Sequence, residues 1–470
     1  MMKMKKIFSA ICALLSVVSM FGTVACGGTT ETPDTPPVQE TPETPENPGE
    51  SETPDTPVTP DVPDTPDTPV TPDTPVTPEE PEVPVMEFVA PKVEDAISYD
   101  SRVKNYLAAG YGAEVTNYNT PSKNTQQAPI KLKWTYDAEG ATKFRVEYGL
   151  KADFSDAQII EVGASKRVAD VYNLFKGMKY YARVSALNSK GEIVAATAGE
   201  FETSNIGPRV MNVEGVYNVR DIGGYAAAGG KTIRQGLIYR GGSVLEVPNN
   251  VYYVNNITDE GKKTMSEIMG VKTEIDFRHA GESGVTLEQG SSIPNATLDY
   301  LTLNGYDHLF DSQYNDEIRE LFDYLADVNS YPIYCHCTGG ADRTGSVVYA
   351  LNTLLGVSHE ECVQDFEITS FSLYGGRSTQ SGTYATNWAN FMQKLDTYAG
   401  ATRQEKVQTW LLSIGVTQAE IDTFKGIMYG EIDVNATGVQ PKEEAPVSAM
   451  KAMSKLCLEA VQAWAVEKKN

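Results

Sequence analysis

A short loop in the second half of the chain constrains the fold more than any other feature. Residues 336–345 read HCTGGADRTG, after a β-type run at 332–335 and before an apolar run at 346–356. The apolar run ends in glycine, which is typical of a buried helix with a glycine at its C-terminus. The sequence therefore predicts a strand, a loop of small residues and a helix, with Cys337 after the strand and Arg343 at the helix start.

A loop of this kind is suited to binding a phosphate dianion. Backbone N–H groups of a glycine-rich loop and of a helix N-terminus point to one place, where a guanidinium can bind two phosphate oxygens. The same donors stabilise a thiolate, so Cys337 should lose its proton readily. A reactive cysteine beside a bound phosphate predicts phosphoryl transfer to sulfur. A buried structural cysteine beside a glycine-rich turn is the alternative, and the flanking His336, Thr344 and Gly345 make it the poorer explanation.

The loop resembles the active-site loop of cysteine-dependent protein tyrosine and dual-specificity phosphatases. The closer match among these is a bacterial branch whose loop reads HCxxGKDRTG, with Ala341 here in place of its lysine. Other stretches that resemble this branch are NVRDIGGY at 218–225, GLIYRGG at 236–242, Asp276-Phe277-Arg278 with Glu282 beyond it, and EITS at 367–370. The resemblance predicts a phosphatase-like catalytic domain over residues 208–430.

Helices and strands alternate through this region, which predicts an α/β domain with a mostly parallel sheet flanked by helices. Helices are expected at 259–269, at 318–328 and from a capping box at Ser358 towards Thr369, and a strand at 271–278. Ligands of such sheets gather at the carboxyl ends of the strands, where Cys337 and Arg278 should both lie.

The resemblance implies a role for each loop residue. Cys337 would be the nucleophile and Arg343 the phosphate clamp, with no cofactor. The sequence contains no Trp-Pro-Asp, so the leaving-group acid is assigned to Asp342 inside the loop, with Asp276 and Asp307 as rivals. The alternative role of Asp342 is a purely structural one, in which it orients Arg343. The substrate-binding backbone would be that of Thr338, Gly339, Gly340 and Ala341, and the supporting residues His336, Thr344, Gly345, Asp276, Arg278, Arg220 and Asp221.

The substrate is expected to be a phosphorylated protein or a small phosphate ester. In the branch that the loop resembles, the lysine is associated with phosphoinositides, so Ala341 favours phosphotyrosine or another aryl phosphate. Phosphoserine, phosphoinositides and inositol polyphosphates remain open. Two other classes are a catalytically inactive surface binding protein and a sulfur-transfer or arsenate-reducing enzyme with a similar loop.

The N-terminal part of the chain predicts export. Residues 1–25 combine three lysines with an apolar run, and Thr23 to Gly28 resemble a bacterial lipobox that would lipidate Cys26. The lipid would hold the protein on the outer face of a membrane, whereas plain secretion is the alternative. Residues 26–85 form a linker of Thr-Pro-Asp-like units, with fifteen acidic and no basic residues between 29 and 85. Such a segment cannot bury a core and should be extended.

Between the linker and the catalytic domain the pattern changes. Residues 86–127 are unassigned and partly helical, whereas 128–204 alternate apolar and polar residues between turns, which predicts a β-sandwich. The stretch from Leu174 to Tyr180 resembles the tyrosine corner of a fibronectin type III domain. In that interpretation Trp134 fills the core and the Tyr180 hydroxyl bonds back to the preceding backbone.

The net charge and the positions of the cysteines and histidines argue against nucleic-acid-binding and metal-dependent functions. Of the net charge of −24, about −12 belongs to residues 86–470, and nothing indicates nucleic-acid binding. No pair of cysteines and no group of the four histidines has metal-ligand spacing, and Cys335 is expected to be a buried strand residue. Residues 431–470 should form a linker and a C-terminal helix that packs on the protein's own core or contacts a partner or membrane.

Overall fold

The computed structural model describes residues 86–121, 123–245, 255–282, 290–435 and 438–440. The predicted export signal, Cys26, the acidic linker and the predicted C-terminal helix lie outside these residues. None of the helices in the described ranges is long and apolar enough to cross a membrane.

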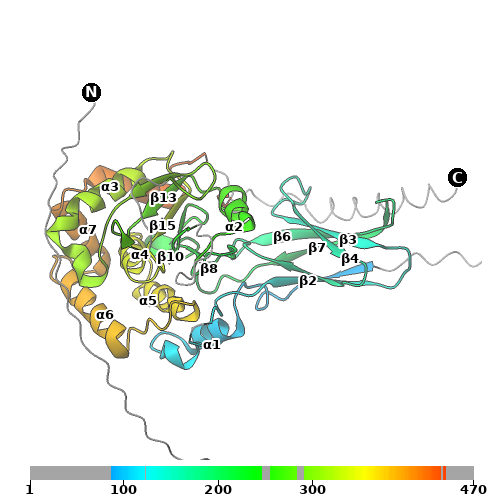
Figure 1. Ribbon diagram of the computed structural model, residues 1–470, viewed down its shortest axis with the longest axis horizontal. Helices are drawn as coiled ribbons and strands as arrows, with labels where there is room; N and C mark the ends of the chain where they lie inside the picture. Colours follow the sequence, from blue (N-terminus) through cyan, green and yellow to red (C-terminus); the bar gives the residue numbers. More distant parts are fainter. Residues whose placement is uncertain (1–85, 122, 246–254, 283–289, 436–437, 441–470) are drawn as a thin grey trace, which may run out of the picture. The chain divides into compact units, whose positions relative to one another are not determined.

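The first domain is a sandwich of two antiparallel sheets, as the alternating pattern predicts. Every second residue of β2 is buried, including Leu132 and Trp134, so one face of this strand forms core and the other meets solvent. The strands of the sandwich lie side by side in Figure 1. One sheet has the order β1 (Met86–Val89), β2 (Ile130–Tyr136), β5 (Val168–Val171), and the other β4 (Gln158–Gly163), β3 (Lys143–Gly149), β6 (Lys179–Leu187), β7 (Ile193–Glu202).

The sandwich core contains the two aromatic residues singled out in the sequence. Trp134 is 2% exposed and its ring lies 5.3 Å from that of Phe144. Tyr180 is buried and stacks on Phe201, and its hydroxyl oxygen accepts a hydrogen bond of 2.8 Å from the backbone N–H of Phe175. The hydroxyl thus bonds back to the preceding backbone, as the sequence predicts.

Residues 86–127, which have no assignment from sequence, divide between the two domains. β1 pairs with β2, so the sandwich begins at Met86 rather than at residue 128. The helix α1 (Ser101–Ala109) and the turn η1 (Val115–Asn117) instead pack against the second domain, where they share a buried cluster with Ile368 and Phe371. Such contacts between residues far apart in the chain leave no periodic signal within the segment.

The second domain is built on a six-stranded sheet with the order β14-β13-β15-β12-β9-β8. The four strands from β14 to β12 are parallel, and β9 and β8 add an antiparallel edge, so the sheet is mostly parallel as expected. Its strands are β8 (Arg209–Val210), β9 (Arg220–Asp221), β12 (Ile238–Gly241), β13 (Thr273–Asp276), β14 (Thr297–Tyr300) and β15 (Ile333–His336), and a separate hairpin is formed by β10 (Ala226–Ala227) and β11 (Lys231–Thr232).

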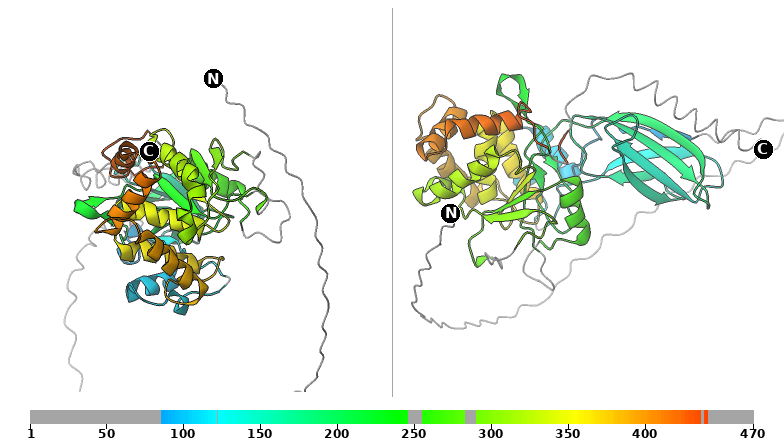
Figure 2. Two further views of the ribbon diagram at one scale, coloured as in Figure 1. Left: turned by 90° about the vertical axis from the view of Figure 1, so that its left-hand side faces the viewer. Right: turned by 90° about the horizontal axis from the view of Figure 1, so that it is seen from above.

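Helices cover both faces of this sheet (Figure 2). Ile275 and Ile333 pack against the larger helical layer, whereas Tyr239 and Tyr334 pack against α2 and its continuation on the other face. The helices are α2 (Asp259–Lys263), which continues as the π-helical turn η3 (Thr264–Ile268), α3 (Asn315–Ala326), α4 (Arg343–Leu354), α5 (His359–Ile368), α6 (Gly382–Leu395), α7 (Arg403–Ser413) and α8 (Gln418–Met428), with 3₁₀ turns η2 (Ala228–Gly230), η5 (Tyr306–Phe310), η6 (Ser312–Tyr314) and η7 (Thr369–Phe371).

The local signals for helix ends agree with the structure. The Ser358 hydroxyl accepts a hydrogen bond from the backbone N–H of Glu361, so it caps α5 where the sequence predicts a helix start. Gly356 follows α4 with a φ of 80°, the left-handed conformation expected of a glycine at a helix end. The helix expected at 259–269 is present, but its second half is π-helical.

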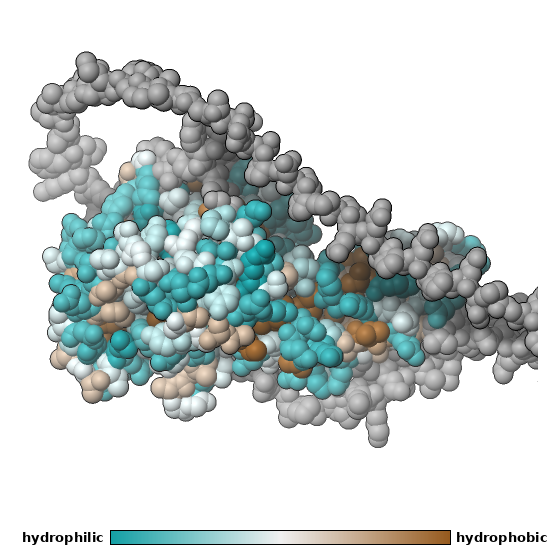
Figure 3. All heavy atoms as spheres, turned by 90° about the horizontal axis from the view of Figure 1, so that it is seen from below, coloured by the Kyte–Doolittle hydropathy of each residue, from teal (hydrophilic) through white to brown (hydrophobic). Residues whose placement is uncertain are grey.

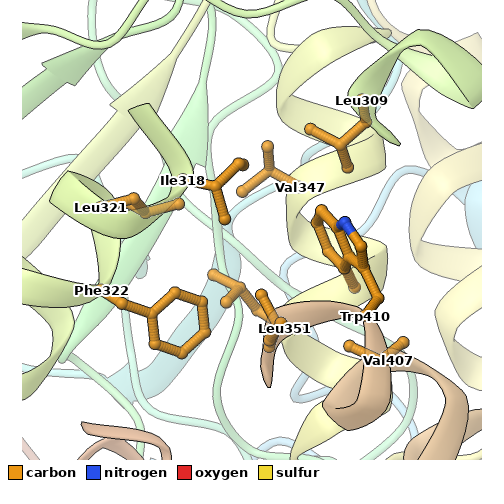
Figure 4. A pocket seen from close by; sticks show the side chains of 10 residues that line it. Leu309, Ile318, Leu321, Phe322, Val347, Leu351, Val407 and Trp410 are labelled. Atoms are coloured by element: carbon orange, nitrogen blue, oxygen red, sulfur yellow. The ribbon is translucent and has the colours of Figure 1, made fainter. Parts of the chain in front are cut away.

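One apolar cavity of this domain and the face shown in Figure 3 give no indication of a binding site. An apolar cavity of about 10 Å³ lies between α3, α4 and α7, lined by residues such as Phe322, Val347 and Trp410 (Figure 4). It is no larger than a water molecule and has no polar partner to hold one. The face shown in Figure 3 is largely hydrophilic, with hydrophobic residues scattered singly between polar ones.

Candidate active site

The loop predicted to bind phosphate lies at the carboxyl end of the parallel strands. β15 ends at His336, directly opposite Asp276 at the end of β13, and α4 begins at Arg343. The loop therefore occupies residues 337–342. Cys337 and Arg278 follow neighbouring strands at the same edge of the sheet, as expected from the topology.

Three consecutive carbonyl groups of the loop are held by donors from other elements. Each donor lies 83 to 121 residues away from its acceptor in the sequence, so the loop conformation is fixed by distant parts of the chain. The Thr338 carbonyl accepts from the Ser243 N–H (3.1 Å) and Asn255 Nδ2 (3.2 Å), the Gly339 carbonyl from Asn218 Nδ2 (2.9 Å), and the Gly340 carbonyl from Arg240 Nη2.

The direction of these carbonyls determines where the loop N–H groups point. In a trans peptide the C=O and N–H point to opposite sides, so the N–H groups of Gly339, Gly340 and Ala341 face away from these donors. From Gly339 to Asp342 no backbone N–H donates to another group in the described ranges. The loop thus presents a row of N–H donors to one place, which is the arrangement that binds an oxyanion.

Two glycines allow the loop to approach its neighbours closely. Gly340 has a φ of 63°, and a Cβ built on it would lie 2.1 Å from the carbonyl oxygen of Gly241. A Cβ on Gly339 would meet the ring of Tyr374 at 2.8 Å. Neither position accommodates another residue without a shift of backbone or ring.

A buried ion-pair network supports the loop from below. Asp365 on α5 accepts from Arg220 Nε at 2.9 Å and from Arg240 Nη1 at 2.7 Å, and both arginines are completely buried. Arg240 also donates to the Gly340 carbonyl, so the network ends at the loop itself. Asp221 pairs with Arg209 at 2.8 Å and accepts from the N–H groups of Gly223 and Gly236. Arg220 thus belongs to the network that reaches the loop, whereas Asp221 belongs to a separate pair with Arg209, and the supporting role of both residues stays a prediction.

The environment of Cys337 favours its thiolate. The residue is only 3% exposed, and burial by itself raises the pKa of the thiol. The charge of Arg343 and the hydroxyl and N–H groups of Thr344 outweigh this effect, so the pKa lies below its ordinary value of 9.0. Cys335, one strand position earlier, is fully buried as expected, and burial raises its pKa to about 12. Only Cys337 of these two is suited to act as a nucleophile.

Arg343 is held by a carboxylate. Its Nη1 and Nη2 donate to the two oxygens of Glu282 at 2.7 and 2.5 Å, and Glu282 also accepts from the Thr338 hydroxyl at 2.9 Å. The hydrogen bonds from Arg343 lower the pKa of Glu282 to about 2. This bidentate pair fixes the plane of the guanidinium at the helix N-terminus, next to the loop N–H groups.

His336 lies beneath the loop and does not reach its open side. Its Nε2 lies 2.8 Å from Glu274 Oε1 and its Nδ1 3.2 Å from the Cys337 carbonyl oxygen. Burial favours the neutral ring, but Asp276 and Glu274 raise the pKa of His336 above its ordinary value. Asp276 is itself buried and bound by Arg278 Nε and Nη2 at 2.9 and 2.6 Å. Glu274 and the Cys337 carbonyl therefore orient His336, and Asp276, which Arg278 binds, lies 3.7 Å from its Nδ1.

Asp342 is held by two residues that sequence reasoning missed. Arg377 donates from Nε to Asp342 Oδ1 at 2.9 Å and from Nη2 to Oδ2 at 3.1 Å, and the Tyr306 hydroxyl donates to Oδ1 at 2.5 Å. Arg377 is 8% exposed and its guanidinium lies over the ring of Tyr384. The carboxylate of Asp342 thus has a defined orientation at the start of α4.

Comparison with known proteins agrees with this geometry. Residues 211–429 match the model of the tyrosine phosphatase family. A protein of Cupriavidus necator with the provisional name tyrosine-protein phosphatase is 24% identical over 211 residues, which cover 40% of this chain and 72% of that protein. The chain carries a tyrosine phosphatase-like enzyme domain.

The structure brings most of the predicted site residues of the phosphatase domain together. Cys337, Arg343 and Asp342 share one loop and one helix start, and the supporting residues lie beneath them. Asp307, a rival acid, lies on η5 behind Gly305, and a Cβ on Gly305 would lie 2.9 Å from the backbone nitrogen of Arg343. Asp307 is partly exposed, and its neighbour Tyr306 donates to Asp342, so η5 lies next to the loop.

The residues that were missed are those that reach the loop from distant parts of the chain. They carry no local motif, since Arg377 and Tyr306 lie 35 and 36 residues from Asp342 in sequence. Asn218 and Arg240 lie inside the stretches that resemble the phosphatase branch, so that resemblance was a usable signal for them. In the described parts of the chain, no group of three or more His, Cys, Asp or Glu residues is placed to hold a metal ion.

Proposed function

We propose that the protein is a surface-anchored phosphatase that hydrolyses phosphate monoesters through a phosphocysteine intermediate. The observation that carries this proposal is the thiol of Cys337, whose pKa is lowered by Arg343 and Thr344 next to a row of inward N–H donors. A nucleophile and an oxyanion site are thereby combined in one loop. Phosphoryl transfer requires little else from the protein than such positioning and charge stabilisation.

The reaction would take place in two displacements. The Cys337 thiolate attacks phosphorus, the bond from phosphorus to the ester oxygen breaks, and the leaving oxygen takes a proton from an acid. Water then attacks phosphorus and gives a proton to the carboxylate that acted as the acid, while the sulfur–phosphorus bond breaks, so inorganic phosphate is released and the thiolate and the acid are regenerated. Arg343 and the loop N–H groups bind the equatorial oxygens in both steps. The Thr344 hydroxyl is buried with no other hydrogen-bond partner in the described residues, so it can donate to the departing sulfur.

The first experiment compares the wild-type chain with Cys337→Ser in the hydrolysis of p-nitrophenyl phosphate. We expect turnover by the wild type and only background hydrolysis by the variant, because a serine hydroxyl is not ionised in this environment. A trapped phosphoenzyme should likewise be absent from the variant. Equal rates for the two proteins would exclude the proposed mechanism and favour the alternative of a catalytically inactive binding protein.

Asp342 is the proposed leaving-group acid, and Asp307 is its alternative. Asp276 is less suitable because its carboxylate is 1% exposed and faces Arg278 and His336 inside the protein. Both oxygens of Asp342 accept from Arg377, so one of these hydrogen bonds must be exchanged when Asp342 carries the proton.

A leaving-group series distinguishes the two acids. If Asp342 is the acid, Asp342→Asn should slow an alkyl phosphate by about 10²- to 10⁴-fold and an activated aryl phosphate far less. Asp307→Asn should then have little effect on either substrate. If only Asp307→Asn slows hydrolysis of the alkyl phosphate, Asp307 is the acid. If Asp342→Asn slows the alkyl and the aryl phosphate equally, the assignment to Asp342 is contradicted.

The charges near the loop favour a substrate with a single phosphate, with phosphotyrosine first. Arg343, Arg278 and Arg377 are each paired with a carboxylate of the protein. Ala341 supplies no cation either. A panel of phosphotyrosine peptides, phosphoserine peptides and phosphoinositides tests this, and preferred hydrolysis of a phosphoinositide would support the alternative substrate class.

The location is proposed from sequence. Cys26 would carry the lipid, residues 26–85 would act as the tether, and the sandwich, which we propose to be fibronectin type III-like, would act as the spacer. Cys26→Ala in the full chain should release the protein from the cell surface into the medium and abolish incorporation of labelled fatty acid. If the wild-type protein is itself found in the medium and carries no lipid, it is secreted without an anchor.

A further inference from the structure

The segment 96–127 lies between the strands β1 and β2 of the sandwich and outside the residues that match the family, yet most of it packs against the phosphatase domain. Val103, Tyr106 and Val115 are buried with Ile368 and Phe371 of α5 and η7. The Tyr106 hydroxyl donates to Glu367. The contact is thus both apolar and polar, and it covers elements directly behind the phosphate-binding loop.

Gln126 connects this segment to the loop through one intervening side chain. Gln126 is 2% exposed, and its Nε2 donates to Asn218 Oδ1 at 2.7 Å and to the Ile368 carbonyl at 3.1 Å. Asn218 is 1% exposed and donates from Nδ2 to the Gly339 carbonyl at 2.9 Å. Two hydrogen bonds, from Gln126 to Asn218 and from Asn218 to the Gly339 carbonyl, therefore connect residue 126 to the loop. The Gly339 carbonyl and the Gly340 N–H belong to the same peptide group, so the second bond also sets the direction of that N–H.

The donors around Asn218 determine how its amide is oriented. Its Oδ1 accepts from Gln126 Nε2 and from Arg220 Nη1, and neither of these groups can accept a hydrogen bond. The Nδ2 must therefore face the Gly339 carbonyl. Without Gln126, the oxygen keeps one of its two donors, and the amide gains freedom to turn away from the loop.

We propose that Gln126 is a positioning residue that acts through Asn218 on the phosphate-binding loop, so that residues 96–127 are a working part of the phosphatase unit. The same segment also holds the strap 370–380, which carries Arg377 and Tyr374. Its contacts with the strap are Thr125 N–H to the Phe371 carbonyl (2.7 Å), Asn119 Nδ2 to the Ser370 carbonyl (2.9 Å), the Ser378 hydroxyl to Glu114 (3.0 Å) and Gln380 Nε2 to the Ala113 carbonyl (2.8 Å). This inference rests on the proposed catalytic role of the loop.

The neighbouring residue offers a matched control. Gln127 donates from Nε2 to Asn212 Oδ1 at 2.6 Å, an interaction of the same chemical type in the same segment. Asn212 exchanges hydrogen bonds with Asn173 of the sandwich and makes no hydrogen bond to the loop. Gln126→Met and Gln127→Met in the full chain each remove one amide–amide hydrogen bond, and only the first is connected to the loop.

The experiment measures the affinity for inorganic phosphate and the pH profile of Cys337 alkylation by iodoacetate, together with turnover. Gln126→Met should weaken phosphate binding about three- to tenfold and move the midpoint of alkylation to higher pH, because the loop donors no longer converge as well. Gln127→Met should change both by less than about twofold, although its melting temperature also falls.

Equal behaviour of the two variants in these readouts would overturn the proposal, whether both are unchanged or both impaired. Failure of the proposed function gives a different result. If the wild type hydrolyses no phosphate ester, phosphate affinity and the alkylation profile still report on the loop, and a selective effect of Gln126→Met would preserve the positioning role.

Discussion

At the scale of single residues, the state of Arg343 is the most informative feature of the site. Its guanidinium is bound to Glu282 in a bidentate pair, so a phosphate that arrives finds the fork already oriented. Sequence reasoning predicted the clamp but gave Glu282 no role of its own. Protonation of the Glu282 carboxylate would weaken this pair and thereby the fixed position of Arg343 beside the loop.

The first prediction concerns acid stability. The pKa of Glu282 is lowered to about 2 from an ordinary value of 4.5, so its contribution to stability is fully present above about pH 4.5 and is lost as pH falls through about 2. In Glu282→Gln, the free energy of unfolding should fall less steeply over this range, by a difference below about 1 kcal/mol because the group is partly exposed. Denaturant titrations between pH 2 and 5 measure this.

Glu267→Gln serves as the control for this comparison. Glu267 is exposed on η3 and has no ion-pair partner among the described residues. Its variant should follow the wild type at every pH. A steeper decline for Glu282→Gln than for the wild type would contradict the expected sign.

The residues of the loop itself could be predicted from sequence because they form one local motif. Cys337, Arg343 and Asp342 lie within seven consecutive positions, and the chemistry of a glycine-rich loop before a helix suggests their roles. Arg377 and Gln126 could not be predicted in this way. Their contacts depend on how α5 and the segment 96–127 fold back onto the loop, and a single arginine or glutamine in a sequence carries no sign of such a partner.

At the scale of elements, α5 links the loop to the rest of the domain. It carries Asp365, which binds Arg220 and Arg240, and its N-terminus is capped by Ser358. The cap lies at the opposite end of the helix from the residues near the loop. Stability and activity should therefore respond differently to changes at the two ends.

The second prediction tests this separation. Ser358→Ala removes the side-chain acceptor for the Glu361 N–H and should cost about 1 kcal/mol of unfolding free energy, with kcat unchanged. Ser358→Asp keeps an acceptor at the cap and should retain most of the stability. Thermal and urea unfolding of the three proteins, beside their kcat values, measure both quantities. A loss of kcat in Ser358→Ala would show that the two ends of α5 are coupled.

Element prediction from sequence succeeded where the periodic signal is long and failed where strands are very short. The alternation in β2, β3 and β6 and the stripe of α3 are each carried by seven or more residues. β8 and β9 have two residues each, and their pairing is decided by the buried Arg209 and Asp221 rather than by any pattern. The edge strand β1 has four residues and no motif beside it, whereas β13 and β15, also of four residues, could be predicted because recognisable motifs follow them.

At the scale of the whole molecule, the sandwich and the phosphatase domain are joined by buried polar contacts. Arg209 pairs with Asp221 in the phosphatase domain and donates to the carbonyls of Leu174 and Asn173 in the sandwich. Lys176 and Gln235 exchange two further hydrogen bonds between the domains, through the Lys176 backbone and the Gln235 amide. These groups leave water only when both domains are folded.

The third prediction follows from this interface between the two domains. The two domains should unfold together in a single calorimetric transition, and Arg209→Met should lower its midpoint strongly, because a buried Asp221 without its partner costs about 3–5 kcal/mol. Arg145→Met, which removes an exposed ion pair with Glu161, should cost less than about 1 kcal/mol. Two separate transitions in the wild type would show that the domains unfold independently.

The outward carbonyls of the loop have a thermodynamic consequence for the whole protein. Asn218, Arg240, Ser243 and Asn255 hold them through contacts within the protein, so the fold itself fixes the backbone conformation of the loop. Capture of phosphate then restricts few additional degrees of freedom, and its entropic penalty is small. The conformational entropy of ordering the loop is lost when the chain folds, in contacts that reach as far as residues 218 and 255.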